Sequence, residues 1–268
     1  MKIMGQLAVI CVFFGIYAYA EDHNEASFFQ RALPFTINAL APPKWDPTNS
    51  FSSNPDAIAL GQILFFDTGL SRSGSIACAT CHVTDGQFLP NADHPAGPSR
   101  NFRTTQPVVG AAYQEFLFWD GRADSLWSQA LAPLEHPQEH DLTRTEAVAY
   151  VQTTYPDAFA QLSQSALLVL ESGDGTTIRA SPIGDQLARD MWDTLSDQEQ
   201  QKTNEAFVIL GKSIAAFEET IPVLHSQWDL WIEALVDDPT SMQEIPANVK
   251  RGFDLFTGKA RCYTCHSG

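Results

Sequence analysis

Two copies of the pattern C-x-x-C-H constrain this chain more than any other feature. The first copy has Cys78, Cys81 and His82, and the second has Cys262, Cys265 and His266. This spacing is typical of covalent haem attachment, in which two thiols bond the porphyrin vinyl groups and the adjacent histidine ligates the iron. A disulfide or half of a zinc site is the alternative for each copy. A redox C-x-x-C pair needs no following histidine, however, and the copies lie far apart in sequence. Two covalently bound haem c groups are therefore predicted.

The remaining cysteine lies in a segment that resembles a secretory signal. Residues 1–20 begin with the cationic Lys2, continue with an apolar run over residues 7–16, and end in small residues at Ala18 and Ala20. The apolar run is short for a membrane span, although an uncleaved anchor is the alternative. Cleavage after residue 20 would remove Cys11 and leave four cysteines, all within the two copies. We therefore expect an exported protein without a membrane span after signal cleavage.

Composition sets the remaining bounds on structure and partners. The chain has 268 residues, of which 44% are hydrophobic, so it can bury a sizeable core. The formal net charge of −16 argues against nucleic acid or an anionic membrane surface as a partner. It is compatible with a basic redox partner, and equally with a charge that only keeps the protein soluble.

The local patterns predict helices. Asn54 before Pro55 is a helix start, and capping boxes begin at Thr143 and at Ser196. Ser181-Pro182 predicts a further helix start. The longest helical pattern follows Ser196 and ends at Pro222, with apolar residues at a spacing of three and four: Phe207, Leu210, Ile214, Phe217 and Ile221. No convincing alternation typical of strands appears, so the predicted fold class is all-α.

A faint internal repeat suggests the domain organisation. The pattern G-x-x-L-F occurs at residues 61–65 and again at residues 252–256, each time before a C-x-x-C-H copy. This arrangement predicts two cytochrome c-like domains, each holding one haem. We expect four segments: a signal peptide (1–20), an extended lead-in (21–54), an N-terminal haem domain with helical insertions (55–222), and the start of a C-terminal haem domain (223–268).

Several longer strings, in order along the chain, resemble the bacterial di-haem cytochrome c peroxidase family, which includes the MauG-like proteins. Besides the C-x-x-C-H copies, they are LGQILFFD (60–67), FWDGR (118–122), QALAPL (129–134) and GKSIAAFE (211–218). The resemblance extends from about residue 55 to the last residue. The family continues well beyond its second C-x-x-C-H, so the resemblance implies that the second domain is incomplete here, apparently truncated. The missing part would supply the sixth ligand of the second haem.

The resemblance also implies an activity. It points to a periplasmic peroxidase that reduces hydrogen peroxide to water, with electrons from a small cytochrome c or cupredoxin passed from the C-terminal haem to the N-terminal haem. A MauG-like oxidase acting on a protein or small-molecule substrate is one alternative, and a non-enzymatic di-haem electron carrier is another. A homodimer is compatible with the sequence.

Roles for individual residues follow from the same resemblance. His82 and His266 would be the proximal iron ligands, and Trp119 would carry electrons between the haems. The distal pocket of the first haem would contain Gln129, which orients peroxide, Pro133, which shapes the pocket, and Glu139, the acid–base catalyst.

Two further residues match less closely. His94 corresponds to a histidine that occupies the sixth position of the N-terminal haem iron in resting peroxidases. Asn101 corresponds to a family ligand of a calcium ion between the domains. Its amide oxygen is a type of ligand that suits such a hard cation. From the residues alone, the simpler interpretations are a solvated surface acid for Glu139, a core tryptophan for Trp119 and an ordinary loop histidine for His94.

Overall fold

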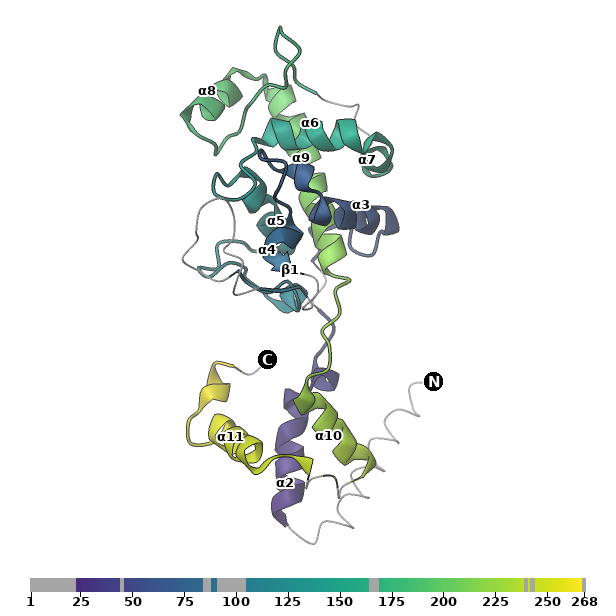
Figure 1. Ribbon diagram of the computed structural model, residues 1–268, viewed down its shortest axis with the longest axis vertical. Coiled ribbons are helices and arrows are strands. Elements are labelled where there is room, and N and C mark those ends of the chain that lie inside the picture. The colour runs from purple at the N-terminus through teal and green to yellow at the C-terminus, as the bar shows by residue number, and fades with distance from the viewer. Residues whose placement is uncertain are drawn as a thin grey trace. The chain divides into compact units, whose positions relative to one another are not determined.

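The computed structural model describes residues 23–43, 46–83, 88–90, 105–163, 169–238, 241 and 244–266, and this part of the chain is helical (Figure 1). Its strands are β1 (His82–Val83) and β2 (Leu89–Pro90), which pair antiparallel with His82 opposite Pro90. The all-α prediction is confirmed. Within these ranges, no helix is both long and apolar enough to cross a bilayer.

The chain divides into two compact units. The larger unit spans Pro43–Pro222, and the smaller one combines described residues before Pro43 with those after Pro222. The larger unit contains α3 (Pro55–Phe66), α4 (Cys78–Cys81), α5 (Leu126–Glu135), α6 (Arg144–Thr154), α7 (Pro156–Leu162), α8 (Gln186–Thr194) and α9 (Asp197–Glu218). The smaller unit contains α2 (His23–Ala32), α10 (Gln227–Asp237) and α11 (Ala247–Thr257).

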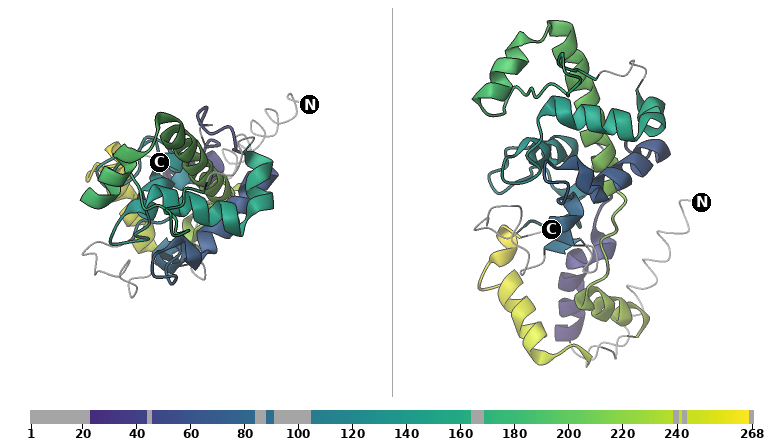
Figure 2. Two further views of the ribbon diagram at one scale, coloured as in Figure 1. Left: turned by 90° about the horizontal axis from the view of Figure 1, so that it is seen from above. Right: turned by 45° about the horizontal axis from the view of Figure 1, so that its top comes forward.

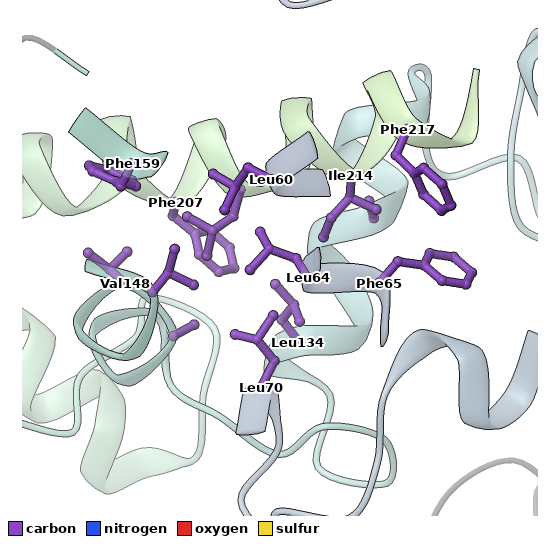
Figure 3. Close-up of a cluster of buried hydrophobic side chains, with 14 of the residues drawn as sticks. Leu60, Leu64, Phe65, Leu70, Leu134, Val148, Phe159, Phe207, Ile214 and Phe217 are labelled. Carbon is purple, nitrogen blue, oxygen red and sulfur yellow. The ribbon is translucent and has the colours of Figure 1, made fainter. Parts of the chain in front are cut away.

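Helix α9 is the centre of the larger unit. It begins with the predicted capping box, in which the backbone N–H of Ser196 donates to Glu199 Oε2 (2.8 Å) and the backbone N–H of Glu199 donates to Ser196 Oγ (3.3 Å). Helices α3, α5 and α6 pack against it, as the further views in Figure 2 also show. The shared core contains Leu60, Leu64, Phe65, Leu134, Val148, Phe207, Ile214 and Phe217 (Figure 3), together with Leu210.

Two glycines allow the helices to approach α9 this closely. A Cβ atom on Gly61 of α3 would lie 1.8 Å from the carbonyl oxygen of Ser213 in α9. A Cβ atom on Gly211 of α9 would lie 2.6 Å from the carbonyl oxygen of Trp127 in α5. Both contacts are with backbone, which cannot rotate away as a side chain can. The absence of a Cβ at these positions therefore sets the spacing of α3 and α5 on α9.

Smaller connecting elements complete the larger unit. They are the 3₁₀ turns η3 (Thr68–Leu70) and η4 (Ala111–Tyr113), together with isolated bridges from Leu117 to Ala123 and from Glu171 to Thr177. The helix predicted to begin at Ser181 begins instead after Asp185, whose side chain caps α8. The Ser181 hydroxyl is used elsewhere: it donates to Glu135 Oε1 (2.6 Å) and accepts from the backbone N–H of Arg144 (2.6 Å).

The smaller unit is built around aromatic rings from both of its chain segments. Phe28 of α2 contacts Phe253 of α11 (ring centroids 5.2 Å apart) and Trp228 of α10 (6.0 Å). Residues 23–32 therefore form a helix, contrary to the extended lead-in expected from the sequence. The reason is long-range: Phe28 and Phe29 are buried only because helices from the far end of the chain cover them. Two 3₁₀ turns, η1 (Leu33–Phe35) and η2 (Ile37–Ala39), follow α2.

Alanine substitutions at the two glycines of the G-x-x-L-F patterns, Gly61 and Gly252, should have opposite effects on stability. Substituting Gly61→Ala forces α3 away from α9, and we expect it to lower the free energy of unfolding by about 1–3 kcal/mol. Gly252→Ala is the matched control, because a Cβ there in α11 meets nothing within 4 Å. It should raise helix stability by about 0.5–1 kcal/mol, as alanine does over glycine. Urea unfolding of the haem-loaded protein, followed by circular dichroism, measures both. Equal effects of the two substitutions would contradict the packing described for α3.

Candidate haem sites

The first C-x-x-C-H forms a single helical turn followed by a short strand. Cys78 and Cys81 begin and end α4, so their side chains lie three residues apart on one helix face. The turn is closed by Thr80, whose hydroxyl accepts from the backbone N–H of Ala77 (2.9 Å). His82 then enters β1 opposite Pro90. Two thiols on one face with a histidine directly after them are the arrangement that thioether attachment requires.

His82 is held among apolar groups. Its ring lies 6.3 Å from the ring of Phe65, centroid to centroid, and Phe65 in turn contacts Phe88 (5.7 Å) and Phe217 (5.4 Å). Burial lowers the pKa of His82 to about 4, and the backbone carbonyl of Gln106 offsets part of that effect. Nδ1 of the ring nonetheless has no hydrogen-bond partner of ordinary geometry. A neutral imidazole with one ring nitrogen that makes no hydrogen bond is the form that can ligate a metal.

Two carboxyl groups lie near the Cys78 thiol. Burial raises the pKa of this thiol, and the charges of Glu218 and Glu139 raise it further. Glu218, at the end of α9, is itself buried, which raises its pKa to about 8, and its Oε2 has no hydrogen-bond partner. Unsatisfied buried polar atoms on Glu218 and His82, together with the Cys78 thiol and the aromatic rings around His82, are groups that a bound cofactor would cover. The residues present are compatible with haem c.

Glu139 lies in the turn that follows α5. Its side chain is about one-third exposed (34%) and lies 3.5 Å from His136 Nδ1. Partial burial raises the pKa of Glu139, while the positive charges of His136 and Arg122 oppose the shift. The charge of Glu139 also acts on the Cys78 thiol of the first C-x-x-C-H, whose pKa it raises. Glu139 is not a fully solvated surface acid.

Gln129 and Pro133 lie one helical turn apart on α5, both half-buried. Proline within a helix lacks an N–H donor, and α5 ends two residues later. The carbonyl of Pro133 accepts from the backbone N–H groups of His136 and His140, both at 3.2 Å. Pro133 therefore shapes the turn that carries Glu139. Gln129 lies on the same helix face as Pro133, one turn before it.

The FWDGR string folds into a stiff turn that displays Trp119. Leu117 and Ala123 pair across its base, while Phe118 (φ 64°) and Gly121 (φ 68°) adopt left-handed conformations. The guanidinium of Arg122 stacks on the Phe118 ring (3.6 Å) and pairs with Asp120 (2.8 Å). Trp119 at the tip is 72% exposed, so it is not the core tryptophan that the simpler interpretation expected.

The second C-x-x-C-H is in a different environment. Residues Cys262–Thr264 form a 3₁₀ turn, η6, after the left-handed residue Arg261, and α11 leads into it. Cys262, Cys265 and His266 are all exposed. The thiols of all four described cysteines are free of disulfide bonds. The Cys and His residues of the second C-x-x-C-H are thus exposed, because few of the described residues pack against them.

Three expectations lie outside the described residues: the signal peptide (1–20), His94 and Asn101. Within the described ranges, no group of three or more His, Cys, Asp or Glu side chains forms a metal site.

Sequence reasoning missed three residues of the first site: Arg122, Glu218 and His140. Arg122 ends the FWDGR string and Glu218 ends the GKSIAAFE string, so the sequence alone could have pointed to these two residues. His140 follows Glu139 directly, where many members of the resembling family have methionine, but its burial and its hydrogen bond to the carbonyl of Leu70 are visible only in the fold.

Comparison with known proteins agrees with this geometry. A family model described as "Di-haem cytochrome c peroxidase" matches residues 55–236. Methylamine utilization protein MauG of Methylorubrum extorquens is 34% identical over 80% of this chain and 50% of its own length. Cytochrome c551 peroxidase of Pseudomonas aeruginosa is 31% identical over 92% of this chain and 58% of its own.

Solved structures share the fold. The di-haem peroxidase BthA of Burkholderia thailandensis aligns with a TM-score of 0.59 at 21% identity, covering 84% of this chain and 52% of that one. The chain spans about half the length of the curated relatives that it matches. The family match covers more than half of the chain and includes the first C-x-x-C-H, Trp119 and Glu139, so this chain belongs to the di-haem cytochrome c peroxidase family.

Proposed function

We propose that the whole protein is a periplasmic di-haem c-type peroxidase that reduces hydrogen peroxide to water with electrons from a small redox protein. One observation carries this proposal: Glu139 is a partly buried acid in the turn after α5, and its charge raises the pKa of the Cys78 thiol in the first C-x-x-C-H. An electron carrier needs no acid–base group at its haem. A peroxidase does, because the reaction H₂O₂ + 2H⁺ + 2e⁻ → 2H₂O requires proton movement between the two oxygens.

The proposed attachment involves four thiols. Cys78 and Cys81 on one side, and Cys262 and Cys265 on the other, each add across a vinyl C=C bond, with the thiol proton passing to the neighbouring carbon. No oxidant is needed. Once bound at these sites, haem supplies the redox chemistry of peroxide reduction. His82 and His266 are the proposed proximal ligands.

Glu139 is the proposed proton carrier. As a carboxylate it accepts a proton from one peroxide oxygen, and as a carboxylic acid it returns that proton to the other oxygen, which leaves as water. The raised pKa of Glu139 suits this exchange, because the carboxylate of a stronger acid would be a weaker base and would accept the proton less readily. Gln129 is proposed to orient the peroxide from α5, and Pro133 to shape the turn that brings Glu139 to it.

The remaining expectations complete the proposal. Residues 1–20 direct export, a small cytochrome c or cupredoxin is the electron donor, and Trp119 lies on the electron path between the haem sites. A distal role for His94 and a calcium ion at Asn101 are part of the same proposal.

A second function is favoured by the exposure of Trp119. A stiff turn that displays an indole ring suits long-range oxidation of a separate protein or small molecule, as in a MauG-like oxidase. The relatives named MauG are consistent with either function. Turnover of peroxide without any reduced small donor, but with a protein substrate present, would favour this second function.

The number of covalent haems tests the attachment residues. The variant with both Cys78→Ala and Cys81→Ala should retain one haem, as should the variant with both Cys262→Ala and Cys265→Ala. The quadruple variant should retain none. Pyridine haemochrome assays and intact-protein mass spectrometry measure this count. An unmodified wild-type chain, produced in a host that matures c-type cytochromes, would contradict the proposal.

Replacing Glu139 tests the acid–base role. Glu139→Gln should lower peroxide-dependent oxidation of a reduced donor by about 10²- to 10⁴-fold, the usual contribution of such catalysis. Because the carboxylate must be ionised to accept a proton, wild-type activity should fall as pH drops through the pKa of Glu139, above the ordinary glutamate value. The variant should lack this acidic limb. Glu171→Gln, at an exposed loop position, is the control. Unchanged turnover in Glu139→Gln would exclude the role.

Trp119→Phe tests the electron path. We expect slower reduction of the first haem site by the donor, with unchanged haem content, because the smaller ring is harder to oxidise. Stopped-flow spectroscopy separates this step from the reaction with peroxide. Trp127→Phe, which loses the hydrogen bond from the indole N–H to Thr48 Oγ1 (2.8 Å), is the matched control. Equal rates in wild type and Trp119→Phe would remove Trp119 from the path.

A further inference from the structure

His140 is a buried polar residue directly after Glu139. Its exposure is 3%, and its Nδ1 lies 2.5 Å from the carbonyl oxygen of Leu70. A carbonyl can only accept a hydrogen bond, so Nδ1 carries the proton. Burial lowers the pKa of His140, an effect that the Leu70 carbonyl partly offsets. The ring is therefore neutral at neutral pH, with its donor directed at the segment that leads to the first C-x-x-C-H.

A second hydrogen bond runs in the opposite direction. The backbone N–H of Arg72 donates to the carbonyl of His140 (2.9 Å). Residues 70–72 are in turn connected to the haem-attachment turn, because Ser71 Oγ accepts from the backbone N–H of Ile76 (3.1 Å), two residues before Cys78. His140 is thus joined on both its side chain and its backbone to the segment that positions Cys78.

Neighbouring contacts hold the turn that carries Glu139 from its other sides. The guanidinium of Arg72 pairs with Asp141 (2.9 Å) and Glu146 (3.0 Å), and Asp141 adopts a left-handed conformation (φ 56°). Toward α5, the N–H of Leu142 donates to the carbonyl of Leu134 (3.0 Å). These contacts hold the ends of the turn and leave the carboxyl of Glu139 out of the network.

The Glu139 carboxyl makes few direct contacts that fix its position. Among the described residues its near polar neighbour is the exposed His136 (3.5 Å), while Arg122 acts on it by charge alone. Its position beside Cys78 therefore depends on the backbone of its turn. Since His140 is the next residue, its two hydrogen bonds to residues 70–72 link this acid directly to the haem-attachment segment, alongside the Arg72–Asp141 pair.

We propose that His140 is a positioning residue that holds Glu139 at the first haem site through its Nδ1–H bond to the Leu70 carbonyl. The proposal rests on the proposed role of Glu139. The charges that act on Glu139 are those of His136 and Arg122, and the groups bonded to His140 from residues 70–72 are the Leu70 carbonyl and the Arg72 backbone N–H.

Two substitutions separate the hydrogen bond from simple filling of space. In His140→Asn, the side-chain N–H can occupy the place of Nδ1–H, whereas the longer side chain of His140→Gln puts its amide near the place of Nε2. His140→Met keeps bulk without any donor. In the haem-loaded full chain, we expect Asn to retain most of the peroxide turnover, and Gln and Met to lose about 10- to 100-fold, the usual cost of misplacing a catalytic group.

A readout other than activity follows the acid directly. The pKa of Glu139 can be measured from its infrared carboxyl band during a pH titration, identified by subtracting spectra of Glu139→Gln. Loosening the turn exposes the carboxyl, so Gln and Met should lower the pKa of Glu139 toward the ordinary glutamate value, and Asn should not. Thr145→Val removes another buried side-chain hydrogen bond, to the carbonyl of Ala180 (3.1 Å), and is the control for general loss of stability.

The double variants decide the interpretation. In a Glu139→Gln background, His140→Met should cause little further loss of turnover, because the residue acts through Glu139. An equal loss in both backgrounds, or an unchanged pKa of Glu139 in the Gln and Met variants, would overturn the proposal. If Glu139→Gln itself keeps full turnover, the acid–base role fails, while a lowered pKa of Glu139 in His140→Met still supports positioning.

Discussion

Backbone-to-backbone contact with α9 is the constraint on which the rest of the larger unit depends. Gly61 and Gly211 let the backbones of α3 and α5 approach α9 closely, and the core residues of these helices interdigitate around that contact. Helix α3 supplies Phe65 to the wall beside His82, α5 carries Pro133 and the turn with Glu139, and α9 ends in Glu218. A shift of any one of these helices would therefore change the first haem site directly.

Local chemistry explains what the sequence predicted well. The capping boxes at Thr143 and Ser196 and the Asn54 cap are formed by side chains within three residues of their partners, so the pattern alone determines them. Long-range packing explains the failures. The helix formed by residues 23–32 requires a cover from α10 and α11, and Ser181 does not begin a helix because its hydroxyl binds Glu135 and Arg144 across the fold.

The same distinction applies to the candidate site. The attachment cysteines and their histidines follow from spacing, since one turn of helix fixes two thiols on a face. The burial of Glu218, the charge of Arg122 beside Glu139 and the hydrogen bond of His140 depend on elements that meet only in the folded chain. The net charge of −16 gave no hint that Glu139 would be partly, and Glu218 fully, withdrawn from water.

The smaller unit is built from two separate segments of the chain. Its first helix is synthesised before the larger unit, and its other helices are synthesised after it. During synthesis α2 emerges early, yet Phe28 has no ring to contact until residues beyond 222 exist. Residues 43–222, by contrast, contain all of their own core. Domains generally fold as units in the order in which they are synthesised, so the larger unit can be complete while the smaller one is still an open chain. Maturation of the second haem site would then lag behind the first, in step with the order in which the polypeptide is made.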